Sequence, residues 1–130
     1  MGLNVFSQNS SNSVNNPALE SLLKPTIGII LYSNDAETVW NAFRFANFSE
    51  SKGDTVAFFL IGKGVEALSI ENENFDIKQK VDDFVEKGRV ILACGTCLNL
   101  RNSDEDNIFI VSTLNELYAL VKSSKIVLTF

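Results

Sequence analysis

Five short apolar runs constrain the fold of this 130-residue chain more than any other feature. They lie at 27–32, 55–61, 90–93, 108–111 and 126–128. Apolar residues fill these runs almost continuously instead of at every second position, which is typical of strands that are covered on both faces. Segments of helical periodicity separate the runs, so crossover connections and a parallel sheet are expected. The sequence therefore predicts a five-stranded α/β domain with a mainly parallel sheet.

Helical segments fill the connections between the runs. The first covers 36–48 and carries apolar residues at helical spacing. A short helical turn at 64–69 and a longer helix at 75–87 follow, and Gly88 ends the longer one. The whole pattern spans 25–130, which we expect to be one domain.

Two helix starts carry capping residues. Asn34 is the expected N-cap of the first helix, which leaves Asp35 free to act as an acid or base. Thr113 is the expected N-cap of the last helix, with Glu116 at the spacing of a capping box.

Residues 1–24 differ in composition from the rest of the chain. They are rich in Asn and Ser, which predicts a disordered or weakly helical tail. The tail lacks the basic start and apolar core of a secretory signal, and no apolar run is long enough to span a bilayer. We therefore expect a cytoplasmic protein without a membrane partner.

Charge and histidine content exclude several function classes. The formal net charge is −5 and no cluster of Lys and Arg is present, so a nucleic-acid partner is not expected. The chain has no histidine, which removes histidine-dependent triads and histidine metal sites.

The two cysteines of the chain lie where an α/β protein places its chemistry. Cys94 follows the third apolar run directly, and Gly95, Thr96 and Cys97 lead into a helical turn. A helix start stabilises negative charge, so we expect it to lower the pKa of the Cys94 thiol. Cys94 is therefore the predicted nucleophile, ionised and within reach of solvent; its alternative role is a buried cysteine that packs as a small apolar residue. Gly95 allows close approach of the backbone and exposes amide groups to an anion.

Cys97 lies one helical turn after Cys94, so the two thiols can be neighbours. Three roles for Cys97 remain open: it resolves an adduct on Cys94 as a disulfide, it packs, or both thiols help to bind a metal. Zinc normally takes four ligands, and this chain offers two thiols and no histidine. We expect no metal and no cofactor.

Ligands of such sheets bind beyond the carboxyl ends of the strands, so the residues there are the remaining candidates. They are Ser33, Asn34 and Asp35 after the first run, Gly62, Lys63 and Gly64 after the second, and Ser112 and Thr113 after the fourth. Gly62-Lys63-Gly64 resembles a small phosphate loop without Walker spacing, and its alternative role is a turn into a short helix. Arg101 shares a helix face with both cysteines; it either steadies a thiolate or is a solvated helix end.

The first helix carries more apolar surface than one sheet face can bury. Phe45 and Phe48 point away from its main apolar arc. Either a neighbouring loop or the N-terminal segment covers them, or they form a subunit interface.

The order of these motifs resembles the DsrE/DsrF-like family of small sulfur-handling proteins. The resemblance spans about 26–130. It is carried by IILYSND at 29–35, FFLIGKGV at 58–65, VILACGTCLNLR at 90–101, STLNEL at 112–117 and KIVLTF at 125–130. Cys94 matches the position of the family's active cysteine, and Cys97 is the additional thiol of a subgroup with a CxxC motif.

The resemblance implies a three-layer α/β/α domain with a five-stranded sheet that assembles as trimers or hexamers. Active members accept sulfane sulfur on a cysteine as a persulfide and pass it to a partner. The leading hypothesis is therefore a sulfur carrier, or sulfurtransferase, working through Cys94, with sulfur donors and acceptors as partners. Two alternatives are a dithiol redox module that cycles Cys94 and Cys97, and a non-catalytic subunit of an oligomer.

Overall fold

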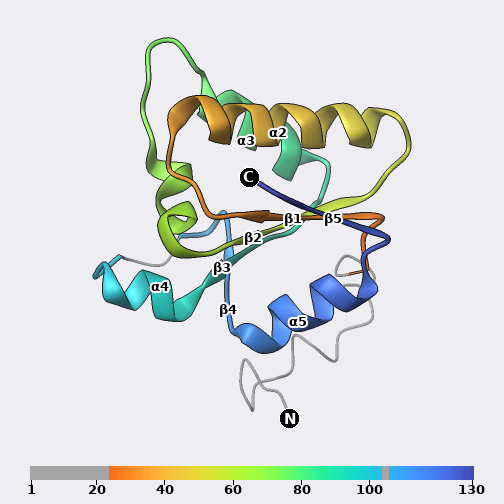
Figure 1. The fold of residues 1–130 in the computed structure, drawn as a ribbon. Helices are drawn as coiled ribbons and strands as arrows, with labels where there is room; N and C mark the ends of the chain where they lie inside the picture. Colours follow the sequence, from red (N-terminus) through yellow and green to blue (C-terminus); the bar gives the residue numbers. More distant parts are fainter. Residues whose placement is uncertain (1–23, 104–105) are drawn as a thin grey trace.

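A computed structural model describes residues 24–103 and 106–130. The predicted N-terminal tail falls almost wholly outside these residues. One five-stranded sheet forms the centre of the molecule, in the order β4-β3-β2-β1-β5 with every pair parallel (Figure 1). The strands are β1 (Ile27–Leu31), β2 (Val56–Leu60), β3 (Ile91–Cys94), β4 (Ile110–Ser112) and β5 (Ile126–Thr129). The predicted parallel α/β sheet is confirmed.

Helices cover both faces of the sheet, which confirms the three-layer arrangement. The long helix α2 (Ala36–Ser51) and α3 (Ile77–Glu86) lie above it in Figure 1, and α4 (Gly95–Leu100) and α5 (Leu114–Ser123) lie below. A 3-10 helix, η1 (Gly62–Ser69), follows β2 directly. None of the helices in the described part of the chain has the length and apolar character needed to cross a membrane.

The core explains why the central strands are apolar without alternation. All five residues of β2 are buried, and Phe58 of this strand stacks on Phe43 of α2 at 4.1 Å between ring centroids. Phe84 of α3 contacts both rings edge-on. Such aromatic pairs stabilise a fold beyond the area that they bury. The packing of α2 and α3 on β2 therefore fixes one side of the sheet.

The helix caps follow the sequence pattern with one difference. Thr113 and Glu116 form the predicted capping box of α5, and Gly88 has the positive φ of a helix stop, +77°. The cap of α2 is Asp35, whose carboxylate accepts a hydrogen bond from Thr38 N at 2.9 Å. The prediction that Asn34 caps this helix is wrong, because the helix begins one residue later than that role requires.

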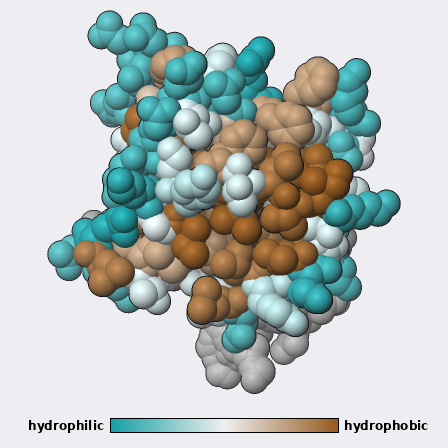
Figure 2. Space-filling view, in the orientation of Figure 1, coloured by the Kyte–Doolittle hydropathy of each residue, from teal (hydrophilic) through white to brown (hydrophobic). Residues whose placement is uncertain are grey.

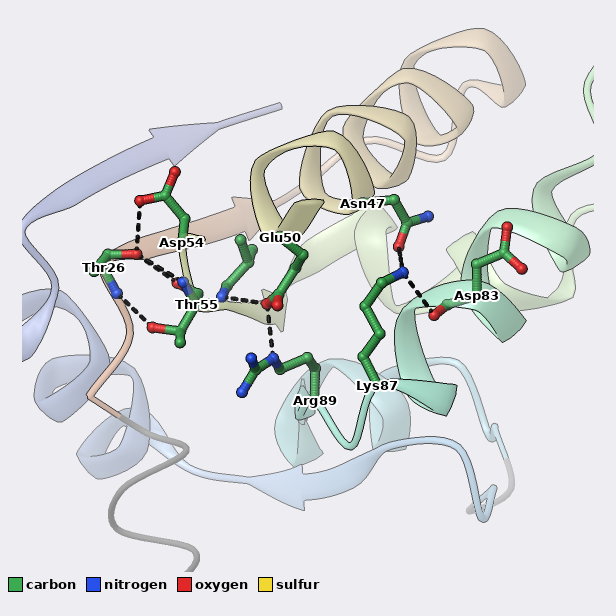
Figure 3. A network of polar contacts seen from close by, with 9 residues as sticks. Thr26, Asn47, Glu50, Asp54, Thr55, Asp83, Lys87 and Arg89 are labelled. Carbon is green, nitrogen blue, oxygen red and sulfur yellow. Dashed lines mark hydrogen bonds and ion pairs between the residues drawn. The ribbon is translucent and has the colours of Figure 1, made fainter. Parts of the chain in front are cut away.

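A polar network ties the elements together at the amino ends of the strands, opposite the cysteines (Figure 3). Glu50 of α2 accepts a hydrogen bond from Val56 N at 2.8 Å, and Arg89 Nε lies 2.8 Å from the same carboxylate as an ion pair. Thr26 and Thr55 exchange backbone-to-hydroxyl hydrogen bonds of 2.9 and 3.0 Å. These contacts hold the amino ends of the strands together, so this end of the sheet is structural.

Candidate functional site

The candidate site lies at the carboxyl end of the sheet, where β1, β2 and β3 end beside one another. Cys94 is the last residue of β3, and η1 begins at Gly62 two residues after β2 ends. Helix α4 packs against η1, although residues 70–94 separate the two elements in the chain. Cys97 of α4 therefore meets Gly62 of the Gly62–Lys63–Gly64 segment, as their positions after neighbouring strands predict.

Cys94 is both the end of a strand and the N-cap of a helix. Its Sγ accepts a hydrogen bond from Cys97 N at 3.3 Å, the role that a Ser or Asp side chain usually takes at such a position. Gly95 begins α4 close to β4, since a Cβ added to this glycine would lie 3.1 Å from Val111 Cγ1.

Burial changes the chemistry of Cys94. Only 8% of the residue is exposed, and this burial raises the pKa of its thiol. A hydrogen bond with the Cys97 side chain raises the pKa further, while the N–H groups of Cys97 and Thr96 lower it. Burial outweighs the amide groups, so the expectation of an ionised Cys94 thiol open to solvent is wrong. At neutral pH the resting Cys94 is a neutral thiol.

Cys97 has a different environment. It is half-buried, and its Sγ accepts a hydrogen bond from Gly62 N at 3.2 Å. An amide donor directed at a sulfur stabilises negative charge on that sulfur. Both cysteines are free, and the hydrogen bond from Cys97 N to Cys94 Sγ makes them neighbours. Among the residues described, no cluster of three or more cysteine and carboxylate side chains is suited to a metal ion.

Arg101 is held by a carboxylate. Its Nε lies 2.6 Å from Glu66 Oε2, and its NH1 donates to the Cys97 carbonyl at 3.2 Å. The guanidinium therefore holds the backbone of α4 in place beside η1. The structure does not support the expectation that it steadies a thiolate directly.

Glu66 joins three segments of the site, and sequence analysis missed it. Its carboxylate accepts hydrogen bonds from Asn34 at 2.9 Å and from Arg101, and these two contacts lower its pKa, with Asn34 the larger cause. The sequence held one signal for Glu66, which is its position: it is the one acidic residue of η1, and η1 follows a predicted strand. Asp35 does not join this group, because it caps α2, and the Thr38 hydrogen bonds lower its pKa.

The glycines of the Gly62–Lys63–Gly64 segment serve the backbone. Gly62 has a φ of +57°, which favours glycine. A Cβ at the buried Gly64 would overlap the carbonyl oxygen of Leu31. Lys63 is exposed. The segment is a turn into a short helix, as the alternative interpretation holds, and it directs the Gly62 amide at Cys97.

Ser112 and Thr113, the candidates after the fourth strand, are used within the fold. The Ser112 hydroxyl donates to Ile110 O at 2.8 Å, and Thr113 is occupied in the capping box. A cavity of about 350 Å³ borders the Glu66–Arg101 pair; its lining includes Glu66 and Leu98 but neither cysteine.

Comparison with known families decides what this arrangement is related to. The model of the DsrE/DsrF-like family matches residues 27–130. The chain belongs to the DsrE/DsrF-like family. This family is generally related to sulfur relay, and the Cys94-Cys97 pair has the spacing of its CxxC subgroup.

Two solved structures share the fold. The YchN protein from E. coli matches with a TM-score of 0.70 at 21% identity, covering 81% of this chain and 98% of YchN. BT1422 from Bacteroides thetaiotaomicron, a conserved protein of unknown function, matches with a TM-score of 0.62 at 19% identity, covering 81% of this chain and 95% of its own. Comparison with curated protein sequences finds no match.

Proposed function

We propose that this member of the family is a sulfur carrier that holds sulfane sulfur as a persulfide on Cys94 and passes it to an acceptor. The observation that carries the proposal is the pair of free cysteines at the carboxyl edge of the sheet, joined by the hydrogen bond from Cys97 N to Cys94 Sγ. Both sulfurs accept a backbone N–H, at 3.3 Å for Cys94 and 3.2 Å for Cys97. Sulfur donors and acceptors are then the partners, in a reducing compartment such as the cytoplasm.

The chemistry that the pair supports is an exchange between sulfur atoms. A cysteine thiolate attacks the terminal sulfur of a donor persulfide R–S–SH, a new S–S bond forms, and R–S⁻ leaves. The exchange leaves the summed oxidation state of the sulfur atoms unchanged, so no outside oxidant or reductant is needed. Backbone amides stabilise the charged sulfur, which matters because the chain has no histidine to act as a base.

Intact-mass measurement after incubation with inorganic polysulfide tests this function. We expect the wild-type chain to gain about one sulfur atom, which dithiothreitol then removes. The double variant Cys94→Ser/Cys97→Ser is expected to gain none. A wild-type mass that stays unchanged, under conditions that load a known persulfide carrier, contradicts the proposal.

A dithiol redox module is the second candidate, favoured by the two neighbouring free cysteines. In that function the pair cycles to a disulfide with a measurable reduction potential. The Cys97→Ser variant distinguishes the two functions. A redox module loses all activity in this variant, whereas Cys94 of a sulfur carrier is still able to bear a persulfide.

We also propose that the chain assembles with copies of itself through α2, as the third hypothesis of an oligomeric subunit requires. Phe45 and Phe48 are 40% and 60% exposed, and together with Arg44 and Phe130 they line an open cavity of about 360 Å³. Figure 2 shows hydrophobic surface gathered across the middle of the face on which α2 and β5 lie. Contiguous exposed apolar surface is typical of a protein interface.

A further inference from the structure

The two cysteines differ in access, and we propose that this difference sets an order of events. Sulfur arrives first at Cys97 and moves from there to Cys94. This relay rests on the proposed function as a sulfur carrier and assigns a separate step to each thiol.

Access to solvent is the first argument. A donor transfers sulfur only by bringing its terminal sulfur to bonding distance, about 2 Å, of the attacking sulfur. Cys94 is 8% exposed, while Cys97 is half-buried. A buried thiol reacts slowly with outside reagents, so a donor of any size meets Cys97 first.

The hydrogen bond from Gly62 supports Cys97 as the receiving thiol. Gly62 N lies 3.2 Å from Cys97 Sγ, so a hydrogen-bond donor is already directed at the sulfur that attacks. The thiolate attacks the terminal sulfur of a donor persulfide, forms Cys97–S–SH and releases the donor as R–S⁻. The donor S–S bond breaks as the new one forms, so the step is balanced.

The second step takes place between the two cysteines. Cys94 attacks the terminal sulfur on Cys97, a Cys94–S–SH bond forms, and the bond to Cys97 Sγ breaks. The Cys94 thiol gives its proton to the departing Cys97 sulfur, and the hydrogen bond of 3.3 Å from Cys97 N to Cys94 Sγ keeps the two residues adjacent. The Gly62 amide stabilises the charge that develops on Cys97 Sγ as it leaves.

The direction of transfer follows from burial. Both sulfurs accept one backbone N–H, Cys94 from Cys97 and Cys97 from Gly62. Cys94 is only 8% exposed, so a persulfide there meets outside thiols less readily than one on the half-buried Cys97. Cys94 is thus the holding position, shielded from outside thiols, and the reverse step returns sulfur to Cys97 for an acceptor.

Single variants and a bulky donor test the relay. Cys97→Ser keeps an oxygen that accepts the Gly62 N–H, so the fold is retained, which circular dichroism checks. Glutathione persulfide is the donor, and inorganic polysulfide is the small-donor comparison. With glutathione persulfide, loading of Cys94 in Cys97→Ser is expected to slow by about tenfold or more, because the buried thiol must react alone.

The matched variant Cys94→Ser is expected to take up sulfur faster than Cys97→Ser does and to retain it on Cys97. Loading of Cys97→Ser at the wild-type rate, or no uptake by Cys94→Ser, overturns the relay and leaves the sulfur-carrier function standing. Failure of the wild-type chain to load from either donor overturns both.

Discussion

Cys94 shows how one residue's environment reverses an expectation drawn from its position. A strand end followed by a helix favours a thiolate, and the amides of Thr96 and Cys97 do lower the pKa of the thiol. The burial of the same thiol has the larger effect and raises its pKa. Sequence analysis located the residue but not the segment beside the cysteine pair. That segment is η1, whose Gly62 contacts Cys97 from 35 residues earlier in the chain.

The titration of Cys94 is the first prediction at this scale. Because only the thiolate reacts with iodoacetamide, the alkylation rate of Cys94 in the Cys97→Ser variant should rise with pH through a midpoint above that of a free cysteine. The neutral thiol is favoured below that midpoint, and charge appears only above it. A midpoint below that of N-acetylcysteine, measured in parallel, would show that the amides outweigh burial.

Glu66 provides the second prediction. Glu66→Gln removes the charge that holds Arg101 at 2.6 Å, so α4 and its Cys97 lose part of their positioning against η1. Sulfur loading from glutathione persulfide should fall by about tenfold, as expected when a reacting group is misplaced. The melting temperature should hardly change, because the pair is partly exposed.

The control for this variant is Glu71→Gln, an exposed carboxylate in the loop after η1. It should load at the wild-type rate. Equal loading in both variants would mean that the Glu66 contacts do not position the site.

At the scale of elements, the pattern of apolar residues was sufficient to predict the strands of the sheet. It said less about the residues that cap the ends of the elements. The runs at 27–32 and 55–61 predict β1 and β2 because strands buried on both faces need apolar residues throughout. The first helix was predicted to begin at residue 36, as α2 does, but its cap was assigned to Asn34, since Asn34 and Asp35 are both good N-caps and local sequence does not choose between them. The bond from Asn34 to Glu66, 32 residues away, is a tertiary contact that local sequence cannot specify.

The turn into η1 gives the third prediction. Gly64→Ala places a methyl group against the carbonyl oxygen of Leu31, so η1 must move away from β1. The free energy of unfolding should fall by about 1–3 kcal/mol, as for other overpacked sites, in urea denaturation. Sulfur loading should fall as well, because the Gly62 amide moves with η1.

Lys63→Ala is the matched control, since this exposed neighbour lies in the same helix. It should unfold as the wild type does. A Gly64→Ala variant of wild-type stability would contradict the close approach of η1 to β1.

At the scale of the whole molecule, one end of the sheet is structural and the other carries the thiols. The Glu50–Arg89 pair and the threonines of Figure 3 close the amino ends of the strands. The exposed aromatic face of α2 is a separate surface, and sequence analysis found it from the surplus of Phe45 and Phe48 on the first helix.

This face gives the fourth prediction. Phe48→Glu introduces a charge on an aromatic surface that is 60% exposed in the single chain, so it should weaken self-association without unfolding the protein. Light scattering after size-exclusion chromatography should show an oligomer for the wild type and a smaller species for the variant. Tyr118→Glu, on the exposed side of α5, is the control and should keep the wild-type mass. A monomeric wild type would contradict self-association through α2.

The most direct test of the central claim is a time course of where sulfur resides in the wild-type chain. Trypsin releases both cysteines in one peptide, residues 90–101, because no Lys or Arg lies between Arg89 and Arg101. After loading with glutathione persulfide and alkylation, fragmentation of this peptide assigns the added sulfur to one cysteine. The account predicts sulfur on Cys97 at early times and on Cys94 later. Sulfur that appears on Cys94 first, or on neither cysteine, would contradict it.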